Sequence, residues 1–132
     1  MHSLNNGNLE EAKKCMKSLI SNVPYSNKKL ANMDMEERYR LILSTILNAI
    51  GCQVEVEHML STGRIDIVAS TSRFIYVVEL KLSNNGGLEA AEKQIISNGY
   101  LKPFLADDRK VIGLAVELDD MGKGLIDWKE VK

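Results

Sequence analysis

Apolar residues recur at helical spacing in two segments of the first half of the chain. In residues 9–20 they return every three or four positions, and Asn8 just before them is a residue type that caps helices. A second segment with a wide apolar face follows Asp34, which forms a capping-box pattern with Glu37. Gly51 is expected to end this second helix. The pattern therefore predicts two helices before residue 52.

From residue 52 onward the pattern changes to short apolar segments that are typical of strands. Apolar and polar residues alternate after Cys52, which predicts a half-exposed strand, and residues 64–69 predict a second strand after a turn. The unbroken apolar run Phe74–Leu82 is typical of a central strand that is buried on both faces. The remaining predicted elements are a helix over residues 88–97, a strand over 110–118 and an edge strand over 126–131.

The order of these elements predicts the fold class. Three consecutive strands joined by tight turns form an antiparallel meander. A helical crossover then returns the next strand parallel to its neighbour. We therefore expect an α/β fold of the order α-α-β-β-β-α-β, with a mixed β-sheet flanked by helices.

Composition places this fold in an ordinary globular protein. The 132 residues are 45% hydrophobic and 27% charged, which suits one domain with its own core. Apolar runs are too short to span a bilayer, and the N-terminus has no signal pattern, so we expect a cytoplasmic protein without membrane contact. Cys15 and Cys52 lack CxxC spacing and are expected to be small apolar residues in a reducing compartment.

Charge divides the chain into two parts. Residues 1–31 carry five Lys and two Glu, a net charge of +3, whereas residues 32–132 carry 12 basic and 16 acidic residues, a net charge of −4. We expect residues 1–31 to be a helical arm and linker, and residues 32–132 to be the domain. A domain of this charge is no polybasic nucleic-acid binder.

The buried run Phe74–Leu82 carries two charged residues near its end, Glu79 and Lys81. Residues two apart on a strand project from the same face, so these side chains are neighbours. Burying a charge without a partner is costly. Asp66, on the preceding predicted strand, offers a second carboxylate. The sequence therefore predicts that two carboxylates and a lysine meet in one small site.

Asp66 followed by the triplet Glu79-Leu80-Lys81 resembles the motif of the PD-(D/E)XK nuclease superfamily. The proline that precedes the aspartate in that motif is replaced here by Ile65, a departure that does not touch the chemistry. The wider pattern, over residues 32–118, is similar to the nuclease-like domain at the C-terminus of bacterial AAA-ATPase-like proteins. The residues that carry this likeness are Glu36, Tyr39, Gly63-Arg64-Ile65-Asp66, Glu79-Leu80-Lys81, Gln94 and Gly99-Tyr100.

This resemblance implies a restriction-endonuclease-like core that hydrolyses phosphodiester bonds, in DNA, with Mg²⁺ or Mn²⁺. Asp66, Glu79 and the backbone carbonyl of Leu80 would be the metal ligands, in keeping with the oxygen ligands that Mg²⁺ prefers. Lys81 would orient or activate the attacking water, or offset charge on the reacting phosphate. Glu36, in the first turn of its helix, would reach the site from the side as a catalytic residue, directly or behind the ligands.

Three further residues are expected to contact substrate. Gln94 would hydrogen-bond to substrate or to a metal-bound water, and Tyr100 would stack on a base or contact a phosphate. Arg64 is the third, and its alternative is an ion pair with Asp66 or with a neighbouring acid. The resemblance also implies an upstream ATPase-like region from which residues 1–31 lead. The alternative for that segment is an arm that packs on the domain or on a partner copy.

Two functions remain open at this point. One is a metal-dependent nuclease, which the Asp66, Glu79 and Lys81 set favours. The other is a non-catalytic module of the same fold that binds nucleic acid or forms a homodimer, which the near-neutral charge favours. GxSxG, HExxH and P-loop patterns are absent from the sequence, so serine hydrolase, zinc protease and ATPase chemistry are excluded within this chain.

Overall fold

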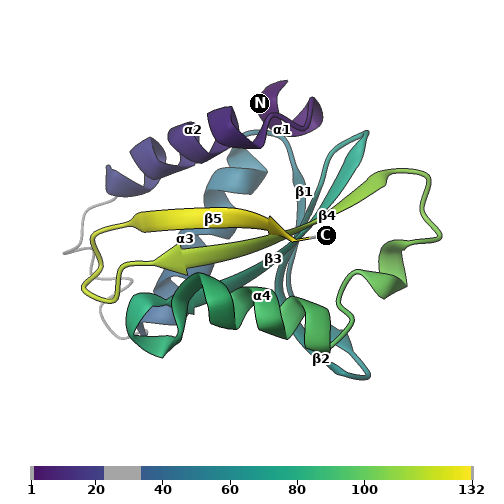
Figure 1. Ribbon diagram of the computed structural model, residues 1–132. Helices are drawn as coiled ribbons and strands as arrows, with labels where there is room; N and C mark the ends of the chain where they lie inside the picture. Colours follow the sequence, from purple (N-terminus) through teal and green to yellow (C-terminus); the bar gives the residue numbers. More distant parts are fainter. Residues whose placement is uncertain (1, 23–33, 132) are drawn as a thin grey trace.

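The computed structural model describes residues 2–22 and 34–131, which form a five-stranded sheet flanked by helices (Figure 1). The helices are α1 (His2–Asn5), α2 (Leu9–Ser21), α3 (Met35–Ala49) and α4 (Gly87–Ser97), with two short 3₁₀ turns, η1 (Ser83–Asn85) and η2 (Lys102–Phe104). The strands are β1 (Gln53–Leu60), β2 (Gly63–Ser70), β3 (Phe74–Leu82), β4 (Lys110–Leu118) and β5 (Leu125–Val131).

The sheet has the mixed topology that the sequence predicts. Its spatial order is β1-β2-β3-β4-β5. The first three strands are antiparallel to one another, β4 is parallel to β3 after the α4 crossover, and β5 returns antiparallel to β4. The predicted α/β class and mixed sheet are confirmed, and the bounds of β3 and β4 agree with those predicted.

Helix ends form where the capping residues predict them. The Asn8 side chain accepts a hydrogen bond from the backbone N–H of Glu11 at 3.2 Å, and the Asp34 side chain accepts one from Glu37 N–H at 2.8 Å. Such caps satisfy N–H groups that have no partner within the helix. Gly51 follows the last turn of α3 with a φ of 103°, a left-handed conformation that glycine adopts without strain.

Each face of the sheet has its own apolar core. Along β3, Tyr76 and Val78 pack on the side of α2 and α3, whereas Ile75 and Val77 pack on the side of α4. This double burial explains why β3 is apolar at nearly every position. The sheet is therefore a central layer with helices on both faces, as Figure 1 shows.

The N-terminal segment belongs to the same core. Ala12 and Met16 of α2 are fully buried in the cluster that contains Tyr76, and Lys13 Nζ lies 2.9 Å from Asp127 of β5. The sequence did not predict α1, whose Leu4 is buried and accepts a hydrogen bond through its carbonyl from the Tyr76 hydroxyl. The predicted boundary between residues 31 and 32 lies outside the described residues.

Across residues 2–22 and 34–131, the longest and most apolar helices still fall short of what is needed to cross a bilayer.

Candidate active site

The ladder between β2 and β3 stops in the middle of β2. Its last pair is Ile67 with Val78, and continuing that register would place Asp66 opposite Glu79. Residues directly opposite each other in an antiparallel ladder share a face. The sequence therefore brings two acids together at the point where the backbones of β2 and β3 stop pairing.

The ladder on the other side of β2 is interrupted at the same residue. β1 pairs with β2 through Val56–Ile67 and His58–Ile65, but Glu57 and Asp66 between them are unpaired. Among the residues that the structure describes, Glu57 is the only one other than glycine with a positive φ, which is 53°. Left-handed backbone at a residue other than glycine costs about 1–3 kcal/mol and concentrates at functional sites. Asp66 thus lies in a local opening of the sheet.

Asp66 and Glu79 are both buried in this opening, with 5% and 2% of their surface exposed. The backbone N–H of Leu80 donates a hydrogen bond to Asp66 Oδ2 at 2.8 Å, which holds the Asp66 carboxylate against β3. Glu79 Oε1 has no hydrogen-bond partner among the described residues. A buried acceptor without a partner is costly, so this oxygen is suited to a proton or a cation.

Burial makes both carboxyl groups weaker acids, and the negative charge of Asp66 adds to this effect on Glu79. Burial and the negative charge of Asp66 together raise the pKa of Glu79 to about 8, although the Lys81 ammonium opposes the shift. Burial also raises the pKa of Asp66, against the Leu80 hydrogen bond and the Arg40 charge, which lower it. The contact between the two carboxyl groups lowers the pKa of Asp66 and raises that of Glu79.

Lys81 and Glu36 complete the predicted catalytic set. Lys81 is half-buried and lies close enough to influence Glu79, Asp66 and Glu36 electrostatically. Burial raises the pKa of Glu36, and the negative charge of Asp66 adds to that effect. Glu36 also lines a cleft of about 410 Å³, formed by the start of α3 together with parts of β1, β2 and β3, and Asp66, Glu79 and Lys81 are not among its lining residues. The structure therefore places Lys81 and Glu36 within electrostatic reach of Asp66.

Arg40 and Glu57 also belong to the surroundings of Asp66, although sequence reasoning missed both. Arg40 Nη1 lies 3.6 Å from Asp66 Oδ1, and Arg40 Nη2 lies 2.7 Å from Glu57 Oε1. Arg40 follows Glu36 by four residues, so the two share one face of α3. That spacing of an acid and a base is the signal that could have identified Arg40. No local pattern predicts the left-handed conformation of Glu57.

Tyr100 is buried, Gln94 is half-buried, and the two form one hydrogen-bonded group beside β2. Tyr100 is 1% exposed, and its hydroxyl donates to the Arg64 carbonyl at 3.1 Å. The same hydroxyl accepts hydrogen bonds from Gln94 Nε2 and Asn98 Nδ2, each at 3.2 Å. In this structure Tyr100 has no exposed surface for the predicted stacking or phosphate contact. Its hydroxyl instead holds the backbone of β2 two residues before Asp66.

Arg64 and Leu80 are the other two residues predicted for the site. Arg64 is exposed, and its Nη1 lies 3.8 Å from Glu57 Oε1, which agrees with the alternative of an ion pair with a neighbouring acid. The Leu80 side chain is fully buried in the core, so only its backbone is available to the site.

The donor set suits a cation that needs few protein ligands. Across residues 2–22 and 34–131, no three Asp, Glu, His or Cys side chains lie together as a possible metal cluster. Mg²⁺ is commonly bound by one or two carboxylates and keeps several waters. Asp66 and Glu79, with the unpartnered Oε1 of Glu79, fit that smaller requirement.

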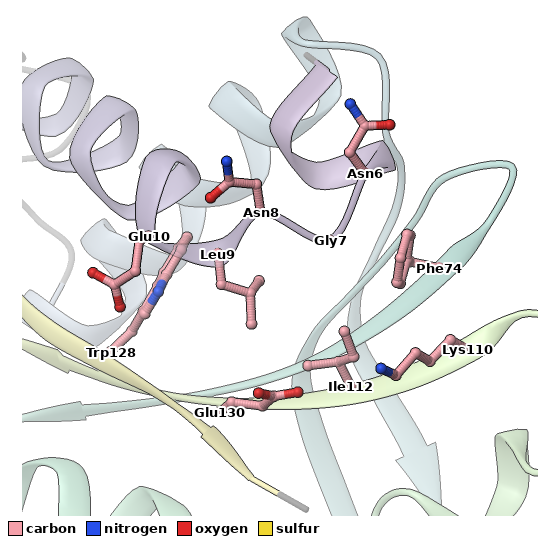
Figure 2. Close-up of a pocket in the computed structure, with 10 residues that line it drawn as sticks. All are labelled: Asn6, Gly7, Asn8, Leu9, Glu10, Phe74, Lys110, Ile112, Trp128 and Glu130. Carbon is pink, nitrogen blue, oxygen red and sulfur yellow. The ribbon is translucent and has the colours of Figure 1, made fainter.

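A separate cavity of about 440 Å³ lies elsewhere on the sheet, beside the turn between α1 and α2 (Figure 2). Its lining comes from that turn, from the start of α2 and from β3, β4 and β5. The residues are Asn6, Gly7, Asn8, Leu9, Glu10, Phe74, Lys110, Ile112, Trp128 and Glu130. It contains none of Asp66, Glu79 and Lys81, so it is distinct from the predicted site.

Comparison with known proteins agrees with this geometry. A family model described as the PD-(D/E)XK nuclease superfamily matches residues 34–128, a span that includes Glu36, Asp66, Glu79 and Lys81. A search of curated proteins finds no match. The mixed five-stranded sheet between helices is consistent with the restriction-endonuclease-like architecture. The chain belongs to the PD-(D/E)XK nuclease superfamily.

Proposed function

We propose that this chain is a metal-dependent nuclease domain that hydrolyses phosphodiester bonds in DNA. One observation carries the proposal: Asp66 and Glu79 are buried together where the ladders of the sheet open, with Lys81 within electrostatic reach. Buried acids with raised pKa values are typical of functional sites, because a structural role alone rarely requires them. Membership of a nuclease superfamily supports the same conclusion.

Asp66, Glu79 and the backbone carbonyl of Leu80 would hold Mg²⁺ or Mn²⁺. When bound, such an ion polarises the phosphate and lowers the pKa of a water molecule. Glu79 must release its proton to become a ligand, and the neighbouring Lys81 ammonium favours that release. The Leu80 N–H fixes Asp66 through Oδ2, while Oδ1 faces the Arg40 guanidinium.

The remaining residues would act on water and substrate. Lys81 would orient the attacking water or balance the negative charge that grows on the phosphate, a stabilisation that is most effective in a water-poor site. Glu36 would accept a hydrogen bond from the attacking water at the side of α3. Arg64, exposed at the rim, would contact the phosphate backbone. Gln94 would act indirectly, since it bonds to the Tyr100 hydroxyl that holds β2.

A second candidate is a non-catalytic module of this fold that binds nucleic acid or forms a homodimer. The net charge of −4 over residues 32–132 favours the homodimer form of this candidate, because an acidic domain repels the dense negative charge of a duplex. Sedimentation of the purified chain with and without a DNA duplex tests this alternative. A stable dimer or DNA complex in a chain that never cleaves would support it over the nuclease.

The association with AAA-ATPase-like proteins is also a proposal. It rests on the motif set from Glu36 to Tyr100, and it makes residues 1–31 the connection from an ATPase-like region of the same protein. Sequencing the reading frame upstream of Met1 tests it. A P-loop signature is expected there, and a frame without one would refute the association.

Cleavage of supercoiled plasmid tests the proposed nuclease function. We expect nicking with millimolar Mg²⁺ or Mn²⁺, none with excess EDTA, and none from the Asp66→Asn variant, which keeps the shape of the side chain but removes its charge. Asp108→Asn is the matched control, because Asp108 is an exposed acid on a loop. Nicking that survives in Asp66→Asn would contradict the proposal.

A further inference from the structure

Arg40 is the strongest feature of the site that the proposed chemistry does not use. Its side chain is only 14% exposed and spans two carboxylates. One nitrogen lies 2.7 Å from Glu57 Oε1, within hydrogen-bonding distance, and the other lies 3.6 Å from Asp66 Oδ1. Guanidinium groups suit such bridges because their donors are fixed in one plane.

The two contacts of Arg40 differ in strength. The shorter one, to Glu57, is the better hydrogen bond, and Glu57 reaches it from a left-handed backbone conformation. The contact with Asp66 is longer than a hydrogen bond, so it acts mainly through charge. Glu57 therefore anchors the guanidinium, and the anchored charge faces Asp66.

This charge lies where a divalent cation would also interact. Asp66 Oδ2 accepts a hydrogen bond from the Leu80 N–H, and Oδ1 is the oxygen that faces Arg40. A cation on Asp66 and Glu79 would experience the Arg40 charge at short range, and little water intervenes at such a buried position. The guanidinium and the cation thus compete for the same carboxylate.

We propose that Arg40 is a built-in counter-charge of Asp66 that a divalent cation must outcompete, and that Glu57 sets the strength of this competition by holding the guanidinium. The inference rests on the proposed metal site. It makes Arg40 a positioning residue that raises the cation concentration at which the site fills. The same contact stabilises the protein when no cation is bound, because it balances a buried negative charge.

Calorimetric titration of the full chain with Mn²⁺ tests this proposal through binding rather than activity. Arg40→Gln should bind Mn²⁺ about tenfold more tightly than the parental chain, which corresponds to about 1.4 kcal/mol. Arg40→Lys keeps the charge and should stay close to the parental Kd. Arg73→Gln is the control, since Arg73 is an exposed arginine at the turn between β2 and β3.

The cation-free melting temperature separates this role from a purely structural one. Arg40→Gln should melt below the parental chain without cation and yet bind Mn²⁺ more tightly, whereas a merely structural residue would lower both stability and affinity. Should Arg40→Gln fail to fold, Glu57→Gln provides the second test. The Glu57→Gln substitution frees the Arg40 guanidinium to approach Asp66, and it should therefore weaken Mn²⁺ binding.

Each result has a definite meaning. A Kd for Arg40→Gln that is unchanged or weaker, with parental binding intact, overturns the role of Arg40 and leaves the proposed function standing. Tighter Mn²⁺ binding by Glu57→Gln would also overturn the proposed role of Arg40. A parental chain that binds no Mn²⁺ overturns both this inference and the metal site of the proposed function.

Discussion

Two neighbouring parts of one sheet are built on opposite principles. Between β3 and β4 every residue from Phe74 to Leu82 has a ladder partner. Around Asp66 the β1–β2 ladder loses one pair and the β2–β3 ladder ends, and the Asp66 side chain accepts a hydrogen bond from the Leu80 N–H instead. The fully paired strands β3 and β4, which we call the closed part of the sheet, provide a rigid frame. The region around Asp66, which we call the open part, holds polar groups in place.

Glu79 and Leu80 show the difference within one strand. Leu80 is fully buried among apolar residues on the side of α2 and α3, whereas Glu79 is buried beside another acid. Removing water from an apolar side chain stabilises the fold, and removing it from a carboxylate destabilises the fold. Candidate chemistry therefore lies in a region that costs stability, next to one that supplies it.

The largest effect on stability is expected from the closed part. Leu80→Ala should lower the free energy of unfolding by about 2–5 kcal/mol, because it removes buried methyl groups and leaves a cavity. Urea denaturation measures this change. The variant keeps the Leu80 N–H, so the contact with Asp66 should persist. A loss below about 1 kcal/mol would mean that this part of the core is less closely packed than the structure indicates.

The open part should make stability depend on pH. The pKa of Glu79 is raised from 4.5 to about 8 in the folded state, so the native protein binds a proton that the unfolded chain has released. The contribution of Glu79 to stability should therefore be largest below pH 4.5, decline between pH 4.5 and 8, and be lost above that.

Replacing Glu79 with Gln should remove most of this decline. Its size should be up to a few kcal/mol, since each unit of pKa shift corresponds to about 1.4 kcal/mol. Urea denaturation at pH 5 and pH 8 compares Glu79→Gln with the parental chain, and Glu89→Gln, at an exposed position of α4, serves as control. Parallel pH profiles for the parental chain and Glu79→Gln would contradict the burial of an acid pair.

Divalent cations should restore part of the stability that the buried acids of the open part remove. A ligand that binds only the native state at 100 times its Kd stabilises it by about 2.7 kcal/mol. The rise in melting temperature with Mg²⁺ or Mn²⁺ should be larger at pH 8 than at pH 6, because Glu79 must lose its proton before it binds. Asp66→Asn should lose this response. Melting curves of the parental chain that ignore millimolar cation would count against a metal site.

The smallest effect concerns the link between the two parts. Tyr100→Phe removes the hydroxyl that holds the Arg64 carbonyl, and it should destabilise the protein by about 1 kcal/mol, a typical value for one hydrogen bond. Hydrogen exchange should become faster at the start of β2 and remain unchanged in β4. Equal acceleration in both strands would show that Tyr100 supports the whole core rather than β2.

The closed part was predictable because its signals are local. The run Phe74–Leu82 is apolar at nearly every position, and only a central strand needs that pattern, so its bounds and its neighbours followed. The helix starts at Asn8 and Asp34 were readable for the same reason. The α1 turn was missed because His2–Asn5 is too short to show a period.

Of the open part, the sequence predicted only the acidic residues. A register argument brings Asp66 opposite Glu79, but nothing in the sequence indicates that Glu57 takes a left-handed conformation or that Arg40 bridges to it. The burial of Tyr100 depends on contacts of the segment after α4 with β2, which join residues far apart in the chain. Catalytic and substrate roles for these residues stay predictions.

The cleavage rate of Lys81→Ala tests the central claim, that the open part of the sheet is a hydrolytic site. Lys81 is half-buried at the end of β3, so its loss should change the free energy of unfolding by less than about 1 kcal/mol. Plasmid nicking with Mg²⁺ should nevertheless fall at least about 100-fold, because a positioned charge supplies about 3 kcal/mol of barrier reduction. Lys93→Ala, at an exposed position of α4, should cleave like the parent. Parental cleavage by a folded Lys81→Ala variant would contradict the account.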